Sequence, residues 1–132
     1  MFEYHGWVTI QSSAGDEDDE DVVGAHNTVS AVVRESGLGT GSVELRMVNG
    51  MSQLRVSGFA NHRAGEGQEI IELFGRIGKL APGSYGLLYF RDDEDRDGKA
   101  NEFQVLVMKR GTVSQNSDPF LSPCVPEIED AD

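Results

Sequence analysis

The dipeptide Asn49-Gly50 constrains the local fold more tightly than any other feature of the sequence. Asn-Gly is the preferred pair for a two-residue type I′ turn, and here it separates two runs in which apolar and polar residues alternate. Such a turn pairs Val48 with Met51 and thereby sets the register of the whole hairpin. This register predicts two apolar pairs on one side and an opposite-charge pair on the other. The apolar pairs are Leu45 with Leu54 and Val43 with Val56, and the charged pair is Glu44 with Arg55.

Hydrophobic periodicity predicts three further elements. Residues 2–11 alternate between apolar and polar side chains, which indicates a half-buried strand with Trp7 on the face opposite the main apolar stripe. Apolar residues recur at helical spacing over residues 22–33 and predict a helix that ends near Gly37. A second stripe at helical spacing predicts another helix over residues 66–81.

Two later segments, residues 84–91 and 103–109, are apolar on both faces. Strands of this kind belong in the middle of a sheet or beneath helices. The acidic residues 92–101 are expected to join them as a long hairpin. After Gly111 several prolines exclude a regular helix, so we predict an extended tail from about residue 111 to 132. Its apolar side chains are expected to pack against the domain; they are Phe120, Leu121, Val125 and Ile128.

The predicted elements follow the order β-α-β-β-α-β-β, which indicates an α+β fold. We expect a mainly antiparallel sheet of about five strands with two helices. The first six elements match the split βαβ arrangement of ferredoxin-like folds, to which the last strand is added. A length of 132 residues fits a single domain, residues 1–132.

The net charge of −12 comes from a few short stretches of the chain. Residues 16–21, 92–97 and 127–132 hold 15 of the 23 acidic residues and a single base, Arg96. Such segments repel nucleic acid and anionic membranes and attract cationic partners over long range. The 11 Lys and Arg residues are dispersed, so neither nucleic acid nor a membrane is an expected partner. The alternative is that the acidic segments serve only solubility.

Three features favour a cytoplasmic location. Cys124 is the only cysteine, which excludes an intrachain disulfide and suits a reducing compartment. The first residues lack the basic and apolar stretches of a secretory signal. No apolar run approaches the roughly 20 residues that span a bilayer.

The pattern Asp93-x-Asp95-x-Asp97-Gly98 resembles the first half of an EF-hand calcium loop. The twelfth position, where a bidentate glutamate belongs, is Gln104, and the flanking segments are typical of strands. We therefore predict no metal site.

The sequence has no catalytic signature, and we predict no catalytic residue and no cofactor. His5, His26 and His62 belong to three separate elements. Nucleophile, zinc-binding and phosphate-binding motifs are absent from the sequence. The alternative is a small acidic enzyme or metal-binding domain that uses His62, His5 or the Asp93 to Asp97 loop, and it requires these groups to converge in a pocket.

Binding to another protein is the function that these features favour most. Complementary charge raises the association rate, and buried aromatic side chains hold a complex together. His5 and Trp7 on one face of the first strand, with Tyr4 on the other, offer an anchor, although packing beneath another element is the alternative for Trp7. The candidate contacts are acidic residues of two segments and the tryptophan: Asp92, Asp93, Glu94, Asp95, Asp97, Asp16, Glu17, Asp18, Asp19 and Trp7.

Four stretches of the sequence are distinctive: MFEYHGW at residues 1–7, APGSYGLLY at 81–89, RDDED at 91–95 and DPFLSPC at 118–124. Together they resemble immunity protein family 7 of bacterial polymorphic toxin systems. The resemblance implies an α+β protein that binds a cognate toxin, often a nuclease, in the cytoplasm of the cell that makes both. The resemblance does not identify which residues of this sequence bind the toxin. A generic protein-interaction domain with another partner remains the further alternative.

Overall fold

The computed structural model describes residues 1–13, 15, 18–36, 38 and 41–125. The helices are α1 (Asp19–Glu35) and α2 (Gln68–Leu80), and a short π-helical turn, η1 (Arg63–Gly67), precedes α2. The strands are β1 (Phe2–Ile10), β2 (Ser42–Val48), β3 (Met51–Ala60), β4 (Tyr85–Asp92), β5 (Gln104–Lys109) and β6 (Thr112–Ser117).

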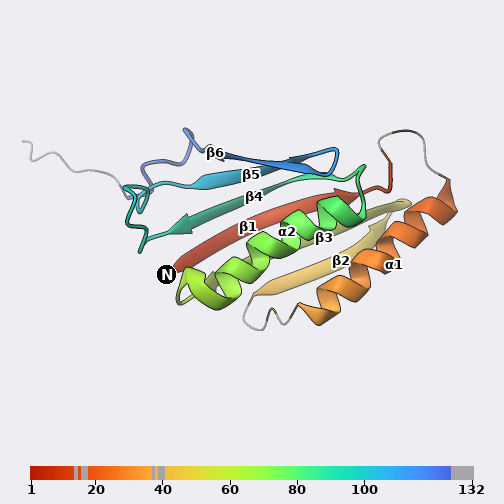
Figure 1. Ribbon diagram of the computed structural model, residues 1–132, viewed down its shortest axis with the longest axis horizontal. Helices are drawn as coiled ribbons and strands as arrows, with labels where there is room; N and C mark the ends of the chain where they lie inside the picture. The colour runs from red at the N-terminus through yellow and green to blue at the C-terminus, as the bar shows by residue number, and fades with distance from the viewer. Residues whose placement is uncertain (14, 16–17, 37, 39–40, 126–132) are drawn as a thin grey trace, which may run out of the picture.

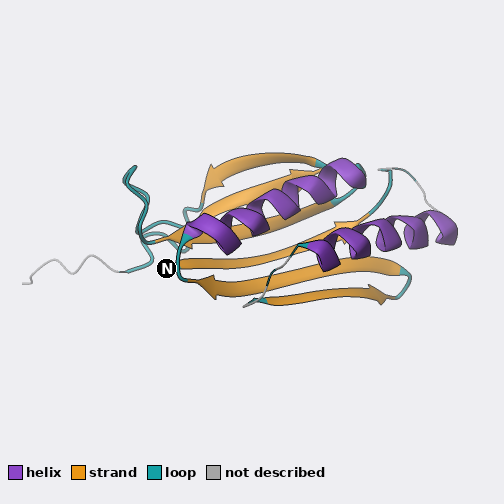
Figure 2. Ribbon diagram, turned by 60° about the horizontal axis from the view of Figure 1, so that its bottom comes forward, coloured by secondary structure: helices purple, strands orange, loops and turns teal. Residues whose placement is uncertain are grey.

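The strands form one antiparallel sheet in the order β2-β3-β1-β4-β5-β6. α1 joins β1 to β2 and α2 joins β3 to β4, and each helix links two strands that run in the same direction with one antiparallel strand between them. This is the split βαβ arrangement, so the predicted α+β fold is confirmed. Both helices cover the same face of the sheet (Figure 1, Figure 2).

The sheet has six strands where about five were predicted, and the tail begins later than residue 111. Residues 112–117 pair with β5 through a turn in which Arg110 and Gly111 have positive φ angles of 48° and 74°. β6 lies at the edge of the sheet, and all its residues except Val113 are exposed. A polar edge strand has no apolar alternation, which is why periodicity did not predict it.

The predicted hairpin is confirmed in its register and in its turn. Val48 pairs with Met51, and the turn residues Asn49 and Gly50 have φ angles of 50° and 76°, as a type I′ turn requires. Glu44 lies opposite Arg55 as predicted. Its carboxylate, however, contacts Arg46 Nη1 on the same strand at 2.9 Å.

The acidic segment before α1 caps that helix. The Asp18 side chain accepts a hydrogen bond from the N–H of Asp21 at 2.8 Å, and the helix begins at Asp19. α2 begins at Gln68 instead of residue 66, because Gly65 in the preceding turn has a φ of 85°. Within the described residues, no helix is long and apolar enough to cross a membrane.

The core lies between the sheet and the two helices. Tyr4 is fully buried there, so it is not available as part of an anchor. Burial and the nearby Glu66 carboxylate raise the pKa of Tyr4 to about 12. Gly58 leaves room for the ring, because a Cβ at this position would lie 2.5 Å from the tyrosine hydroxyl. Other large buried side chains are Phe2, Ile10, Ile70, Ile77 and Leu88.

The predicted packing of the tail's apolar side chains is wrong where the structure describes them. Phe120, Leu121 and Val125 are 87%, 59% and 58% exposed, and Ile128 lies outside the described residues. Polar contacts hold this segment instead. The Asn101 amide donates to Val125 O at 2.9 Å and accepts from Val125 N at 2.7 Å.

Candidate functional site

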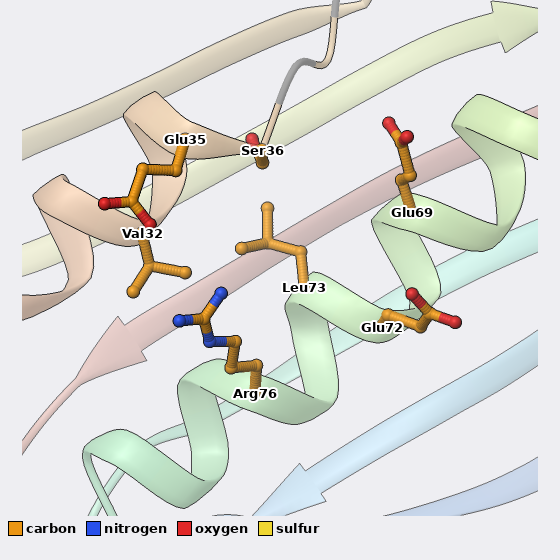
Figure 3. A pocket seen from close by; sticks show the side chains of 7 residues that line it. All are labelled: Val32, Glu35, Ser36, Glu69, Glu72, Leu73 and Arg76. Carbon is orange, nitrogen blue, oxygen red and sulfur yellow. The ribbon is translucent and has the colours of Figure 1, made fainter.

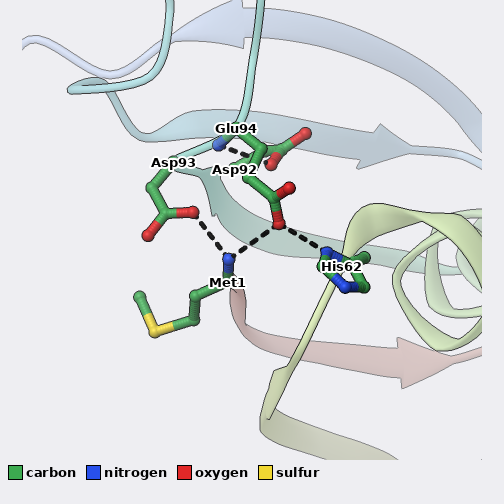
Figure 4. A network of polar contacts seen from close by, with 5 residues as sticks. All are labelled: Met1, His62, Asp92, Asp93 and Glu94. Atoms are coloured by element: carbon green, nitrogen blue, oxygen red, sulfur yellow. Dashed lines mark hydrogen bonds and ion pairs between the residues drawn. The ribbon is translucent and has the colours of Figure 1, made fainter.

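The acidic loop, residues 92–97, comprises the end of β4 and the first part of the connection to β5, and it lies beside the start of β1. Antiparallel pairing places Phe2 opposite Asp92 and so brings the ammonium group of Met1 to the loop (Figure 4). The ammonium nitrogen lies 2.6 Å from Asp93 Oδ1 and 3.2 Å from Glu94 Oε1. The same Glu94 oxygen lies 2.6 Å from His62 Nδ1.

These contacts favour the ionised form of two carboxylates. The hydrogen bond from the Met1 ammonium group is the main cause of the lowered pKa of Asp93. The pKa of Glu94 is lowered first by its hydrogen bond with His62 and then by that with Met1. Both groups therefore keep their negative charge into acidic solution. Part of that charge is already neutralised by the ammonium group of Met1.

Two other carboxylates shape the backbone of the acidic loop. Asp92 Oδ1 accepts a hydrogen bond from Glu94 N at 3.0 Å, and Asp95 Oδ1 accepts one from Asp97 N at 2.6 Å. Such contacts are typical of tight turns. Asp97 is exposed at the end of this turn. The structure thus brings five of the predicted contact residues together on one loop.

The second acidic segment lies at the opposite end of the sheet. Asp18 and Asp19 begin α1, which follows the end of β1, whereas the acidic loop lies beside the start of β1 (Figure 1). At about 3.3 Å per residue, β1 separates the two ends by roughly 26 Å. Asp16 and Glu17 lie outside the described residues. The described acidic candidates therefore form two separate surfaces.

Trp7 lies between these ends, on the face of the sheet opposite the helices. Its side chain is 39% exposed and packs edge-on against Tyr85, with ring centroids 6.1 Å apart. The neighbours Tyr4 and Val8 point to the buried face of β1, and both described helices lie on one face of the sheet (Figure 2). Trp7 is therefore a surface residue and not one packed beneath a helix.

Trp7 belongs to a wider surface that we call the aromatic face. The register places Trp7 beside Leu87 and His5 beside Tyr89. His5 also packs edge-on against Phe59, which is 60% exposed. Most of these neighbours were not singled out from the sequence, although the two-sided apolar character of residues 84–91 was a signal for them. The aromatic face consists of His5, Trp7, Phe59, Tyr85, Leu87 and Tyr89.

A hollow of about 440 Å³ opens on the aromatic face. Its lining includes the rings of His5, Trp7 and Tyr89, with Gln53 and Arg55 from β3. Arg55 donates to the neutral Gln53 Oε1 at 3.4 Å and has no ion-pair partner among the described residues. The hollow therefore combines an apolar wall with the guanidinium group of Arg55, which lies on the strand opposite Glu44 but forms no ion pair with it.

A second hollow, of about 200 Å³, lies between the two helices (Figure 3). Val32 of α1 and Leu73 of α2 give it an apolar part, and Arg76 projects from α2 towards α1 (Figure 3). Its remaining lining is mostly acidic and was not predicted from the sequence: Glu35, Glu69 and Glu72, with Ser36.

The three histidines contact different partners, so they do not form one cluster. His62 and Glu94 are both exposed. Within the described residues, no group of three or more His, Cys, Asp or Glu side chains is arranged to hold a metal ion. The contacts are His5 Nε2 with Glu3 Oε2 at 2.6 Å, His26 Nδ1 with Ser52 Oγ at 2.7 Å and His62 Nδ1 with Glu94 Oε1 at 2.6 Å.

Comparison with known proteins gives a family match over nearly the whole chain. Residues 1–130 match the family described as Immunity protein 7. No curated protein matches the chain significantly. A solved structure of a phage SAM lyase in complex with S-methyl-5′-thioadenosine is similar over 91% of this chain and 92% of that chain, with a TM-score of 0.32 and 10% sequence identity. A similarity this weak gives no information about the activity of the present chain.

Proposed function

The chain belongs to the Immunity protein 7 family, and on this premise we propose that it binds a cognate toxin and neutralises it. The family match over residues 1–130 is the observation that carries the proposal. An immunity protein protects the cell that makes the toxin, so we place the complex in the cytoplasm of the producing cell.

The acidic surfaces suggest how a toxin would be recognised. A nuclease toxin binds a polyanion and therefore exposes a basic cleft. The carboxylates of the acidic loop are suited to such a cleft, because Asp93 and Glu94 stay ionised and Asp92 and Asp95 are held by backbone hydrogen bonds. Long-range attraction between the two charge patterns raises the association rate.

Production of the chain together with the toxin encoded by the neighbouring gene tests this function. We expect growth to stop when the toxin is produced alone and to continue when both proteins are produced. A folded acidic protein of similar size and charge is the matched control, and it should give no protection. Arrested growth despite accumulation of the folded chain would show that the proposed function is wrong.

A further inference from the structure

The aromatic face is more apolar than an exposed sheet face normally is. An antiparallel sheet with one solvated face usually presents polar residues on that face. Here β4 contributes Tyr85, Leu87 and Tyr89, and β5 continues the apolar surface with Val107 opposite Leu87. Among the described elements, both helices lie on the other face (Figure 2). Neighbouring exposed apolar side chains are a feature of interaction sites, and here Trp7, Phe59 and Tyr85 are 39%, 60% and 43% exposed.

The residues around the hollow are those that dominate binding at protein interfaces. Tryptophan, tyrosine and arginine are enriched among residues whose loss costs most affinity. Trp7, Tyr89 and Arg55 line one hollow of about 440 Å³, which is large enough to receive a side chain of a partner. The aromatic rings supply apolar contact area, and the guanidinium group supplies a donor fork for a carboxylate.

The charges on this side of the sheet identify the kind of partner. Glu44 is paired with Arg46, and the carboxylate of Glu3 contacts His5, so both acids are already partnered. The bases on this side of the sheet outnumber these two acids, and Arg91 also acts on the nearby Asp93 carboxylate; the bases are Arg46, Arg55, Arg91 and Lys109. A second copy of the chain, packed face to face by a two-fold axis, would bring like charges together. A partner with an apolar ridge and an acidic group is complementary.

We propose that the aromatic face is the surface on which the toxin domain docks, with an apolar ridge of the toxin in the hollow and a toxin carboxylate against Arg55. This inference rests on the proposed function and adds a division of roles to it. The acidic loop steers the toxin and governs the association rate. The aromatic face anchors the toxin and governs the dissociation rate.

Substitution on the aromatic face tests the anchor. A catalytically inactivated form of the toxin from the neighbouring gene is the probe, and surface plasmon resonance gives both rate constants. We expect Trp7→Ala to weaken binding at least about 30-fold and Arg55→Glu at least about 10-fold, mainly through faster dissociation. Phe120→Ala is the matched control, because it removes an aromatic ring that is 87% exposed and does not line this hollow, and it should change affinity less than about twofold.

A second measurement does not depend on the stability of any variant. Trp7 is the only tryptophan in the chain, so incorporation of 5-fluorotryptophan gives one ¹⁹F resonance that reports on the aromatic face alone. Saturation with the inactivated toxin should shift this resonance and reduce the exposure of the fluorinated Trp7 ring to solvent.

Three results would overturn the inference in distinguishable ways. The first result is tight toxin binding that leaves the ¹⁹F resonance unshifted, or that folded Trp7→Ala and Arg55→Glu variants retain. It would show that the toxin docks elsewhere, and the proposed function would still hold. A wild-type chain that sediments as a dimer, with a monomeric Trp7→Ala variant, would assign the face to a second copy. Failure of the wild-type chain to bind the toxin would reject both the docking surface and the proposed function.

Discussion

His62 Nδ1 lies 2.6 Å from Glu94 Oε1, and this contact joins the segment after β3 to the acidic loop. The same oxygen lies 3.2 Å from the ammonium nitrogen of Met1. One carboxylate therefore connects three parts of the chain that are distant in sequence. The acidic loop is positioned against β1 and the start of η1, so its charges are presented in a defined arrangement.

Because of the contacts of Glu94, we expect the free energy of unfolding to depend on pH in the acidic range. Its pKa is lowered by folding, so the stability that it contributes is present above the usual pKa of glutamate and is lost as the pH falls through the lowered value. Glu94→Gln should reduce the loss of stability between neutral and acidic pH. Urea unfolding at a series of pH values measures this effect. Glu69→Gln, at an exposed residue of α2, is the control, and an equal effect of both substitutions would contradict the assignment.

The buried hydroxyl of Tyr4 predicts a second dependence, at alkaline pH. Folding raises its pKa from 10.0 to about 12, so its contribution is complete below pH 10 and is lost as the pH rises through about 12. Tyr4→Phe should make the unfolding free energy less sensitive to pH in this window. Tyr85→Phe, on the aromatic face, should leave the sensitivity unchanged. An alkaline profile that Tyr4→Phe does not alter would contradict this account.

Two glycine-to-alanine substitutions should change the free energy of unfolding in opposite directions, one in the Asn49-Gly50 turn and one in α1. Gly50 has a φ of 76°, which an alanine adopts only with strain, so Gly50→Ala should destabilise the fold by about 1 kcal/mol. Gly24 lies within α1, and a Cβ there meets nothing within 4 Å, so Gly24→Ala should stabilise the fold by about 0.5–1 kcal/mol. Chemical denaturation measures both changes. A Gly50→Ala variant as stable as the wild type would show that the turn does not require its left-handed backbone, and a destabilised Gly24→Ala variant would contradict the prediction for α1.

The acidic loop predicts an effect on association more than on dissociation. A double variant, Asp93→Lys with Asp95→Lys, should lower the association rate with the toxin about tenfold at low salt, and the wild-type rate should fall as salt is added. The control is Glu35→Lys with Glu72→Lys, which changes the net charge equally at the groove between the helices. If both double variants slow association equally, net charge alone acts and the acidic loop has no special role.

The elements that are determined by residues close together in the sequence could be predicted. The hairpin register followed from Asn49-Gly50, because a type I′ turn leaves one way to pair the flanking strands. β6 was not predicted, because its polar residues lie at an edge and the Arg110-Gly111 turn has no strong sequence signature. Strand order depends on contacts between distant residues, such as Phe2 with Asp92, which periodicity does not report.

The candidate surfaces were predicted only in part, for a related reason. The sequence identified the acidic residues and Trp7, since charge runs and a single tryptophan are visible without a structure. It did not show that the acidic segments lie at opposite ends of β1, or that Tyr85 and Tyr89 join Trp7 on one face. The tail was expected to pack through Phe120, but polar contacts between Asn101 and Val125 hold it and leave that ring exposed.

Titration of the purified chain into the purified, active toxin tests neutralisation most directly. Toxin activity on its own substrate is followed as the molar ratio increases. We expect activity to fall linearly and to vanish near one equivalent of the chain. Full toxin activity in the presence of a large excess of the folded chain would contradict this expectation.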